Sequence, residues 1–95
     1  MTGKESGTPI RTIKNWFYPM KDLLIRIAQA LVDDPEQVQV TEIEAARTSV
    51  LELSVAKSDM GKIIGRHGRT VDAIRVVLIA AAGKTRRRYF LELVE

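Results

Sequence analysis

The stretch Gly61-Lys62-Ile63-Ile64-Gly65-Arg66-His67-Gly68-Arg69 decides how the fold of this chain is interpreted. Gly65 and Gly68 stand three positions apart inside an apolar context that is typical of helices. Because a glycine has no Cβ, the chain can turn sharply there and its backbone can lie close to a ligand. Arg66 and His67 between them carry or can acquire positive charge. The stretch therefore predicts a loop that holds an anionic ligand, such as a sugar–phosphate backbone.

A short and a longer helix are predicted on the two sides of this loop. Ser58 or Asp59 can cap a short helix that runs through Ile64. After the loop, apolar residues recur at helical spacing over residues 70–82. The inward stripe of this longer helix, with Val77 beside it, consists of Val71, Ile74, Leu78 and Ala81.

The longer helix also carries apolar residues outside that stripe. Val76 and Ile79 lie away from it, and a helix that is apolar on more than one side often has a second burial partner. These two residues predict an oligomer face, which would serve a homodimer or a heterodimer. Gly83 follows as the predicted C-cap.

The remaining segments complete an α+β pattern. A helix begins at Met20 and is stopped by Asp33-Asp34-Pro35. Its apolar stripe consists of Met20, Leu23, Leu24, Ile27, Ala30 and Leu31. Residues 38–45 are predicted as a strand with a phase slip that indicates a bulge or an edge position. This strand forms a hairpin with residues 49–55, and residues 88–94 form a last strand. The order predicts helices on one face of a three-stranded sheet.

The composition excludes several classes of protein. The 95 residues suffice for one small domain with one core. Because the chain has no cysteine and one histidine, we expect no disulfide framework, no metal site and no cofactor. No apolar run approaches the roughly 18 residues of a membrane span, and no apolar signal segment is present. We therefore expect a cytoplasmic protein without a membrane partner.

Positive charge is concentrated in the part of the chain that contains the loop. Residues 57–88 have nine lysines and arginines against two aspartates, a net charge of +7, while the remainder of the chain carries −4. Such asymmetry points to an anionic partner on one side of the fold. A solvated basic surface would explain a charge excess alone about equally well.

Two features that look catalytic do not meet the requirements of a catalytic site. Gly83-Lys84-Thr85 is similar to the end of a phosphate-binding P-loop. The full motif needs a glycine where Leu78 stands and a strand before the loop. No serine, cysteine or carboxylate is placed to form a triad with His67. We therefore predict no catalytic residue and no enzymatic activity.

The stretch Val55–Arg75, VAKSDMGKIIGRHGRTVDAIR, resembles the signature of a KH domain. Its centre is similar to the I-G-x-x-G loop that stands between two helices in that family. The element order resembles the type II version, in which the extra helix and strand precede the core, so the resemblance implies a three-stranded mixed sheet. From Met20 to about Glu95 the chain resembles the small bacterial single-KH proteins of the KhpA type, also called the YlqC family.

This resemblance implies a protein that clamps about four nucleotides of single-stranded RNA. Seven residues are then expected at the RNA-binding site: Lys62, Ile64, Gly65, Arg66, His67, Gly68 and Arg69. The resemblance further implies an RNA chaperone or post-transcriptional regulator linked to cell-wall homeostasis and cell shape. It would act with itself or with a larger KH-containing partner of the KhpB or Jag type. The alternative is a protein-interaction module in which the apolar helix and the aromatic tail drive dimerisation.

Other interpretations stay open for several of these residues. An ordinary helix–turn–helix corner would also place two glycines at this spacing. Core packing is favoured for a set of apolar residues, some of which would form a wall against bases: Ile63, Ile64, Val71 and Ile74. A second basic patch consists of Lys84, Arg86, Arg87 and Arg88. It is interpreted as a charged turn before the last strand, or as an extension of the RNA footprint or of a partner-binding surface.

Residues 1–19 differ from the single domain expected over residues 20–95. Their glycines, serine and proline indicate a loose tail, whereas Trp16-Phe17-Tyr18 can pack on the domain or on a partner. Proteins of the family usually begin near the position of Met20. The segment is therefore either a native extension or the result of a misread start.

Overall fold

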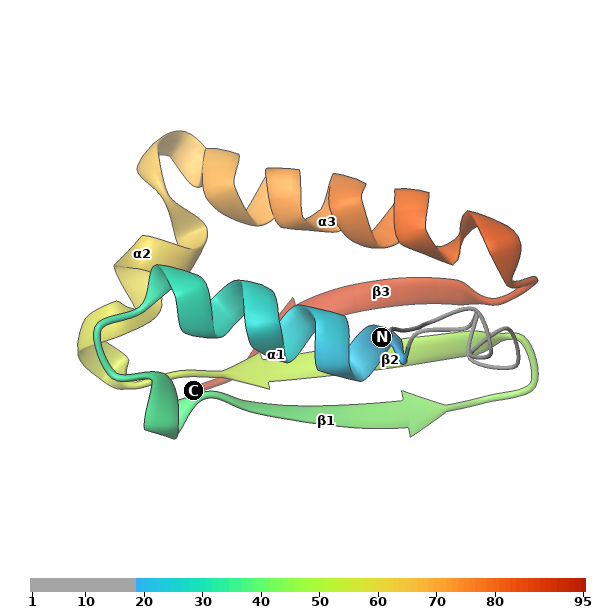
Figure 1. Ribbon diagram of the computed structural model, residues 1–95, viewed down its shortest axis with the longest axis horizontal. Helices are drawn as coiled ribbons and strands as arrows, with labels where there is room; N and C mark the ends of the chain where they lie inside the picture. Colours follow the sequence, from blue (N-terminus) through green and yellow to red (C-terminus); the bar gives the residue numbers. More distant parts are fainter. Residues whose placement is uncertain (1–18) are drawn as a thin grey trace, which may run out of the picture.

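The computed structural model describes residues 19–95, in which three helices and three strands follow the predicted order (Figure 1). The elements are α1 (Met20–Leu31), β1 (Gln39–Glu44), β2 (Thr48–Ser54), α2 (Met60–Ile64), α3 (Arg69–Ala81) and β3 (Arg88–Leu93). The predicted α+β class is confirmed. The expectations for the tail, including Trp16-Phe17-Tyr18, lie outside the described residues.

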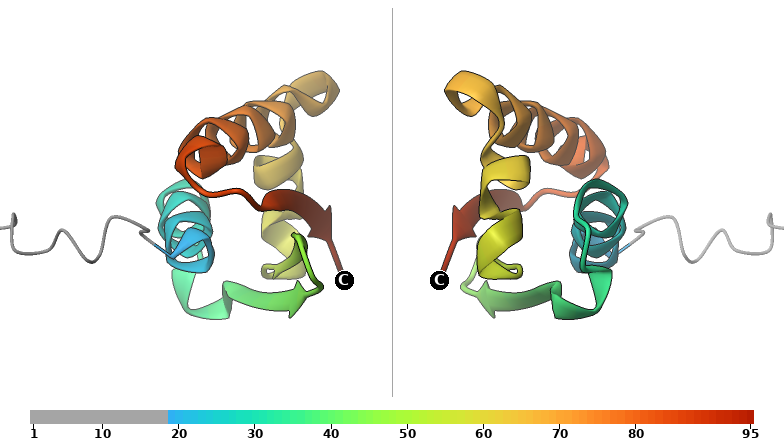
Figure 2. Two further views of the ribbon diagram at one scale, coloured as in Figure 1. Left: turned by 90° about the vertical axis from the view of Figure 1, so that its right-hand side faces the viewer. Right: turned by 90° about the vertical axis from the view of Figure 1, so that its left-hand side faces the viewer.

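The sheet is mixed, with the strand order β1-β2-β3. β1 and β2 form the predicted antiparallel hairpin, in which the Ala45 amide donates to the Thr48 carbonyl at 2.8 Å. β2 and β3 are parallel, because the chain returns through α2 and α3 before it enters β3. The helices lie on one side of the sheet, and no described element covers its other face (Figure 2).

One hydrophobic core lies between the helices and the sheet. Leu51 and Leu53 of β2 are buried, as the predicted alternation requires. The fully buried residues that anchor the helices are Leu24 of α1, Ile63 of α2 and Leu78 of α3. Since α2 and α3 are both anchored in this core, the loop between them is held in place from two sides.

α1 buries a narrower face than the predicted stripe. Met20, Leu24 and Ala28 are buried, whereas Ala30 and Leu31 are exposed. Residues four positions apart stay on one side of a helix, so Ala28 continues the face that Met20 and Leu24 begin. Ala30 has turned away from it, and Leu31 is the last residue of the helix.

α3 also ends differently from the prediction. It passes directly into a 3-10 turn, Ala82–Lys84, and Ala82 is buried in place of Ala81. Gly83 does not have the positive φ of a left-handed C-cap. Instead, the amide and the hydroxyl of Thr85 both donate to the Ala82 carbonyl at 2.9 Å.

The phase slip in β1 reflects its edge position and not a bulge. The pairing runs without interruption from Gln39 opposite Ser54 to Glu44 opposite Ser49. Ile43 therefore points to the open face of the sheet, where it is 51% exposed. An apolar residue on the solvent side of an edge strand produced the irregular pattern.

Candidate nucleic-acid interface

The chain reverses direction between α2 and α3 through the loop Gly65–Gly68. α2 closes with the Gly65 amide donating to the Gly61 carbonyl at 2.8 Å. Gly65 then has φ 77° and ψ 172°, and Gly68 has φ 73° and ψ 12°. His67 between them is also left-handed, with φ 58°. Because such angles are uncommon for residues that carry a Cβ, the two glycines permit the sharp turn that the sequence predicts.

The two glycines are required for different reasons. A Cβ on Gly65 would overlap the Thr70 side chain, since it would lie 2.6 Å from the Thr70 Cβ. It would also lie 2.8 Å from the Thr70 nitrogen. A Cβ on Gly68 would meet nothing within 4 Å. Packing and φ together therefore require glycine at position 65, whereas the space beside Gly68 is open to the close approach of a ligand.

Three of the predicted cationic or ionisable residues surround this loop. Arg66, His67 and Arg69 are exposed. Among residues 19–95, neither arginine has an ion-pair partner. The loop leads into the N-terminus of α3, whose amides and dipole favour an anion. The arrangement can bind a phosphate with side-chain and backbone donors together.

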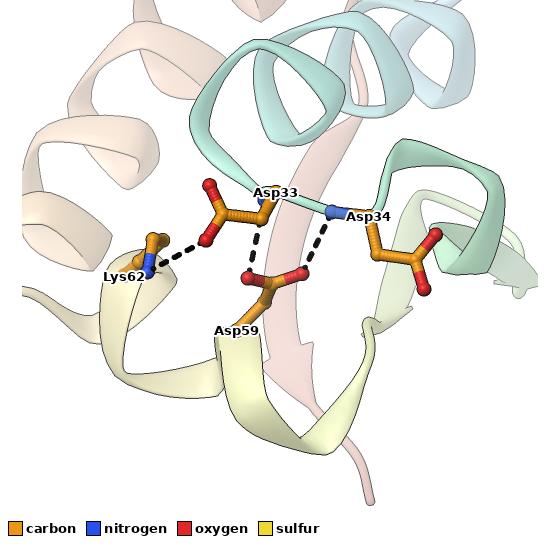
Figure 3. A network of polar contacts seen from close by, with 4 residues as sticks. All are labelled: Asp33, Asp34, Asp59 and Lys62. Carbon is orange, nitrogen blue, oxygen red and sulfur yellow. Dashed lines mark hydrogen bonds and ion pairs between the residues drawn. The ribbon is translucent and has the colours of Figure 1, made fainter.

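Lys62, the fourth predicted cation, already has an acidic partner. Its Nζ lies 3.2 Å from Oδ2 of Asp33, in the segment that follows α1 (Figure 3). Both side chains are exposed. Because the carboxylate offsets part of the charge of Lys62, we expect this residue to attract a phosphate less strongly than Arg66 or Arg69 does.

A buried carboxylate joins the end of α1 to the start of α2. Asp59 is 1% exposed, and its Oδ1 and Oδ2 accept the amides of Asp33 at 3.1 Å and Asp34 at 3.0 Å (Figure 3). Asp59 stands at the N-cap position of α2, as one of the two predicted alternatives, but its side chain makes no capping hydrogen bond to that helix. The backbone amides that follow α1 need hydrogen-bond acceptors. This need is the signal from which the role of Asp59 could have been predicted.

The apolar residues around the loop divide into core and surface. Ile63, Val71 and Ile74 are buried, whereas Ile64 is 38% exposed. Of the four residues for which the sequence favours core packing, Ile64 is the one exposed enough to form an apolar wall against a base. It precedes Gly65 directly, so a base that lies against it would be next to the loop.

A groove of about 460 Å³ runs between the second half of α3 and β3. Its lining residues are Arg75, Leu78, Ile79, Ala82, Gly83, Arg87, Arg88, Tyr89, Phe90 and Leu91. Arg75, at the end nearer the loop, follows Gly68 by seven residues, which corresponds to about 10 Å along a helix. A single strand that leaves the loop along α3 would therefore enter an apolar groove with arginines at its rim.

Tyr89 contributes an uncharged phenol to this groove. Partial burial, followed by the negative charge of Glu42, raises the pKa of Tyr89 above its ordinary value of 10.0. The phenol therefore stays protonated at neutral pH and adds no negative charge that would repel a phosphate.

The second basic patch consists of residues with different roles. Arg87 Nη2 donates to the carbonyls of Ala45 at 2.7 Å and Thr48 at 3.3 Å. Its Nη1 donates to the Ala46 carbonyl at 3.4 Å, and its Nε donates to Ser49 Oγ at 3.2 Å. Arg87 thus holds the β1–β2 hairpin turn. Arg86 and Arg88 are exposed, while the side chain of Lys84 lies outside the described part of the structure.

The described residues have no feature of a metal site or of a membrane span. Over residues 19–95, no group of three or more His, Cys, Asp or Glu side chains could hold a metal ion. None of the helices in this range combines the length and apolar character needed to cross a bilayer.

Comparison with known proteins identifies related sequences. The family described as "KhpA/KhpB, KH domain" matches residues 21–93. The RNA-binding protein KhpA of Chlamydia pneumoniae is 47% identical over 76 residues, which cover 80% of this chain and 97% of that protein. The RNA-binding protein KhpA of Clostridium acetobutylicum is 49% identical over 75 residues, which cover 79% and 100%. The protein of the same name from Halalkalibacterium halodurans is 47% identical over 76 residues, which cover 80% and 100%.

Proposed function

Because the chain belongs to the KhpA/KhpB KH-domain family, we propose that it binds single-stranded RNA through the loop Gly65–Gly68. The observation that carries this proposal is the open space beside Gly68, next to the exposed Arg66 and Arg69. The family is one of RNA-binding domains and not of enzymes, so the prediction of no enzymatic activity is confirmed.

The loop holds the backbone of the RNA. The sugar–phosphate chain passes over Gly68, where no Cβ would keep it at a distance. Arg66 can donate two parallel hydrogen bonds to one phosphate, and Arg69 with the first amides of α3 attracts the next. A KH loop of this kind clamps about four nucleotides. Most of the binding free energy would then come from phosphates and would not depend on the base sequence.

The bases lie along α3. Ile64 gives an apolar surface next to the loop, and a groove lies farther along α3, between this helix and β3. Among residues 19–95, the aromatic side chains are Tyr89 and Phe90, which lie on opposite faces of β3. They cannot stack successive bases as a platform does. Base preference would therefore be modest and would depend on a few hydrogen bonds to base edges.

The cellular role that we propose is that of an RNA chaperone or post-transcriptional regulator in the cytoplasm, linked to cell-wall homeostasis and cell shape. This role rests on membership of the KhpA/KhpB family. The same membership supports, as a proposed partner, a larger KH-containing protein of the KhpB or Jag type. A homodimer is the other proposed assembly.

A protein-interaction module is the second candidate function. Val76 and Ile79, which the sequence predicts as an oligomer face, are 64% and 67% exposed on α3. Two such apolar side chains on one helix suit a contact with another protein. In this candidate, α3 carries the function and the loop binds RNA incidentally.

The double substitution Arg66→Asp and His67→Asp tests the loop. Both side chains are exposed, so the fold should persist, and circular dichroism checks this. We expect the affinity for a short fluorescein-labelled RNA to fall roughly tenfold or more, because charge-assisted hydrogen bonds to phosphate are lost. Fluorescence anisotropy measures the affinity.

The matched control is the double substitution Arg26→Asp and Gln29→Asp on the exposed side of α1. It changes the net charge by the same amount but lies away from the loop. If both double variants bind RNA equally well, the loop does not hold the backbone and the proposed site is wrong.

A further inference from the structure

The face of the sheet that points away from the helices carries a row of apolar side chains. Ile43 of β1 lies opposite Val50 of β2, and Val50 lies opposite Phe90 of β3. Their neighbours Leu51 and Leu91 are buried in the core, so the alternation of side chains along a strand turns these three to the open face. Ile43 and Phe90 are 51% and 50% exposed, and Val50 is half-buried. We call these three residues the open-face row.

Two carboxylates lie beside the open-face row on the same face. Glu52 and Glu92 follow Val50 and Phe90 by two positions and lie opposite each other in the β2–β3 pair. Like charges directly opposite one another on a sheet destabilise it. Neither carboxylate forms an ion pair with another side chain that the structure describes. A cationic and apolar segment on this face would therefore relieve the repulsion and cover the row together.

The described part of the chain begins close to the open-face row. α1 and β1 are in contact and run in opposite directions (Figure 1), so Met20 lies near the end of β1 that carries Ile43. β1 is an edge strand of the sheet. A chain that precedes Met20 can therefore pass around this edge to the open face. Four extended residues span at most about 14 Å and seven about 25 Å, so residues 13–16 are within reach of the row.

Residues 1–18 have the composition that this surface requires. The second half of the segment contains the apolar residues Ile10, Ile13, Trp16 and Phe17. The segment also has three cationic side chains against one carboxylate, a net charge of +2: Lys4, Arg11 and Lys14 against Glu5. Both its apolar residues and its charge thus complement the open face.

We propose that residues 10–17 lie across the open face of the sheet, with Trp16 and Ile13 against the open-face row and the cations beside Glu52 and Glu92. A separate molecule suits this surface less well. The exposed parts of three side chains fall far short of the roughly 800 Å² that each partner of a stable complex buries. A segment joined to α1 binds intramolecularly, at an effective concentration on the order of millimolar, so a small patch is enough to hold it.

The fluorescence of Trp16, the one tryptophan of the chain, tests this contact in the full-length protein. In the wild type, we expect emission at a shorter wavelength than in the urea-unfolded protein, and protection from acrylamide quenching. The double substitution Ile43→Ser and Phe90→Ser removes the apolar surface and should abolish both the shift and the protection. The matched control, Val76→Ser and Ile79→Ser, removes side chains of α3 that are 64% and 67% exposed and should change neither.

A charge substitution tests the same contact without altering the apolar row. Glu92→Lys should make Trp16 easier to quench, because the new cation repels those of the segment. Glu36→Lys makes the same change of charge at an exposed position after α1 and should leave the quenching as in the wild type. Circular dichroism checks that each variant keeps the fold. Since Glu92 is exposed, this measurement remains decisive even if the double apolar variant does not fold.

Several results would overturn the proposal. One is a wild-type Trp16 that emits and is quenched as in the unfolded protein. Another is a shift that survives Ile43→Ser and Phe90→Ser, and its loss in the control variant would then place the segment on α3. A shift that disappears on dilution would make a second copy of the chain the partner of the segment. Unchanged quenching in Glu92→Lys would contradict the pairing of charges.

Discussion

At the scale of single residues, Gly65 and Gly68 have similar φ angles but different surroundings. Gly65 faces the side chain of Thr70 across a space that no Cβ could occupy, whereas Gly68 faces open space. Gly65 therefore matters mainly for the stability of the fold. Gly68 is needed mainly for what approaches the loop.

Alanine substitutions should separate these two roles. Gly65→Ala should lower the free energy of unfolding by about 3 kcal/mol, because left-handed strain adds to steric overlap. Gly68→Ala should lower it by about 1 kcal/mol from strain alone, yet it should weaken RNA binding because its methyl group stands in the path of the backbone. Urea unfolding and RNA anisotropy measure the two effects. Equal losses of stability would mean that Thr70 moves aside without difficulty.

At the scale of elements, Arg87 ties the start of β3 to the hairpin between β1 and β2. It reaches back across 42 positions of the chain to the Ala45 carbonyl. The β2–β3 pair is parallel, so no tight turn links the two strands directly. The guanidinium group supplies a link at this end of the sheet, and the groove beside α3 depends on the resulting position of β3.

Arg87→Ala should therefore lower the free energy of unfolding by about 2 kcal/mol, through the loss of charge-assisted hydrogen bonds to backbone carbonyls. Arg86→Ala, which removes the exposed arginine next to it, should change stability by less than about 0.5 kcal/mol. Chemical unfolding of both variants measures the difference. If both variants lose similarly little free energy of unfolding, Arg87 does not stabilise the hairpin and belongs to the basic surface patch alone.

At the scale of the whole molecule, the uneven distribution of charge acts together with the loop. Residues 57–88 carry +7 and include α2, the loop and α3, whereas the rest of the chain carries −4. An RNA strand bound at the loop would lie against the part of the chain that carries the excess positive charge. The attraction should therefore be largely electrostatic and sensitive to salt.

Affinity for RNA should fall linearly on a plot of log K against log salt concentration. The slope should be roughly −0.7 for each neutralised phosphate, or about −2 to −3 for a clamp on four nucleotides. The slope of the Arg66→Asp, His67→Asp variant should be shallower. An association that does not depend on salt would instead favour the protein-interaction function of α3.

The sequence by itself determined the features that depend on near neighbours. Alternation in β2, helical spacing in α3 and the positions of Gly65 and Gly68 specify the elements, their order and the turn between them. These signals are local, because periodicity and backbone freedom act over a few residues. The family signature is readable for the same reason: most of it lies within Val55–Arg75.

Only the tertiary structure decided what the individual charged side chains do. Asp59 accepts amides 25 and 26 positions away, Arg87 binds the hairpin 42 positions away, and Arg75 meets the Leu91 carbonyl 16 positions away. A charged residue in a sequence carries no mark of the distant backbone group that it will meet. The reason is that such partners are set by how helices pack on a sheet, and not by the pattern of any one segment.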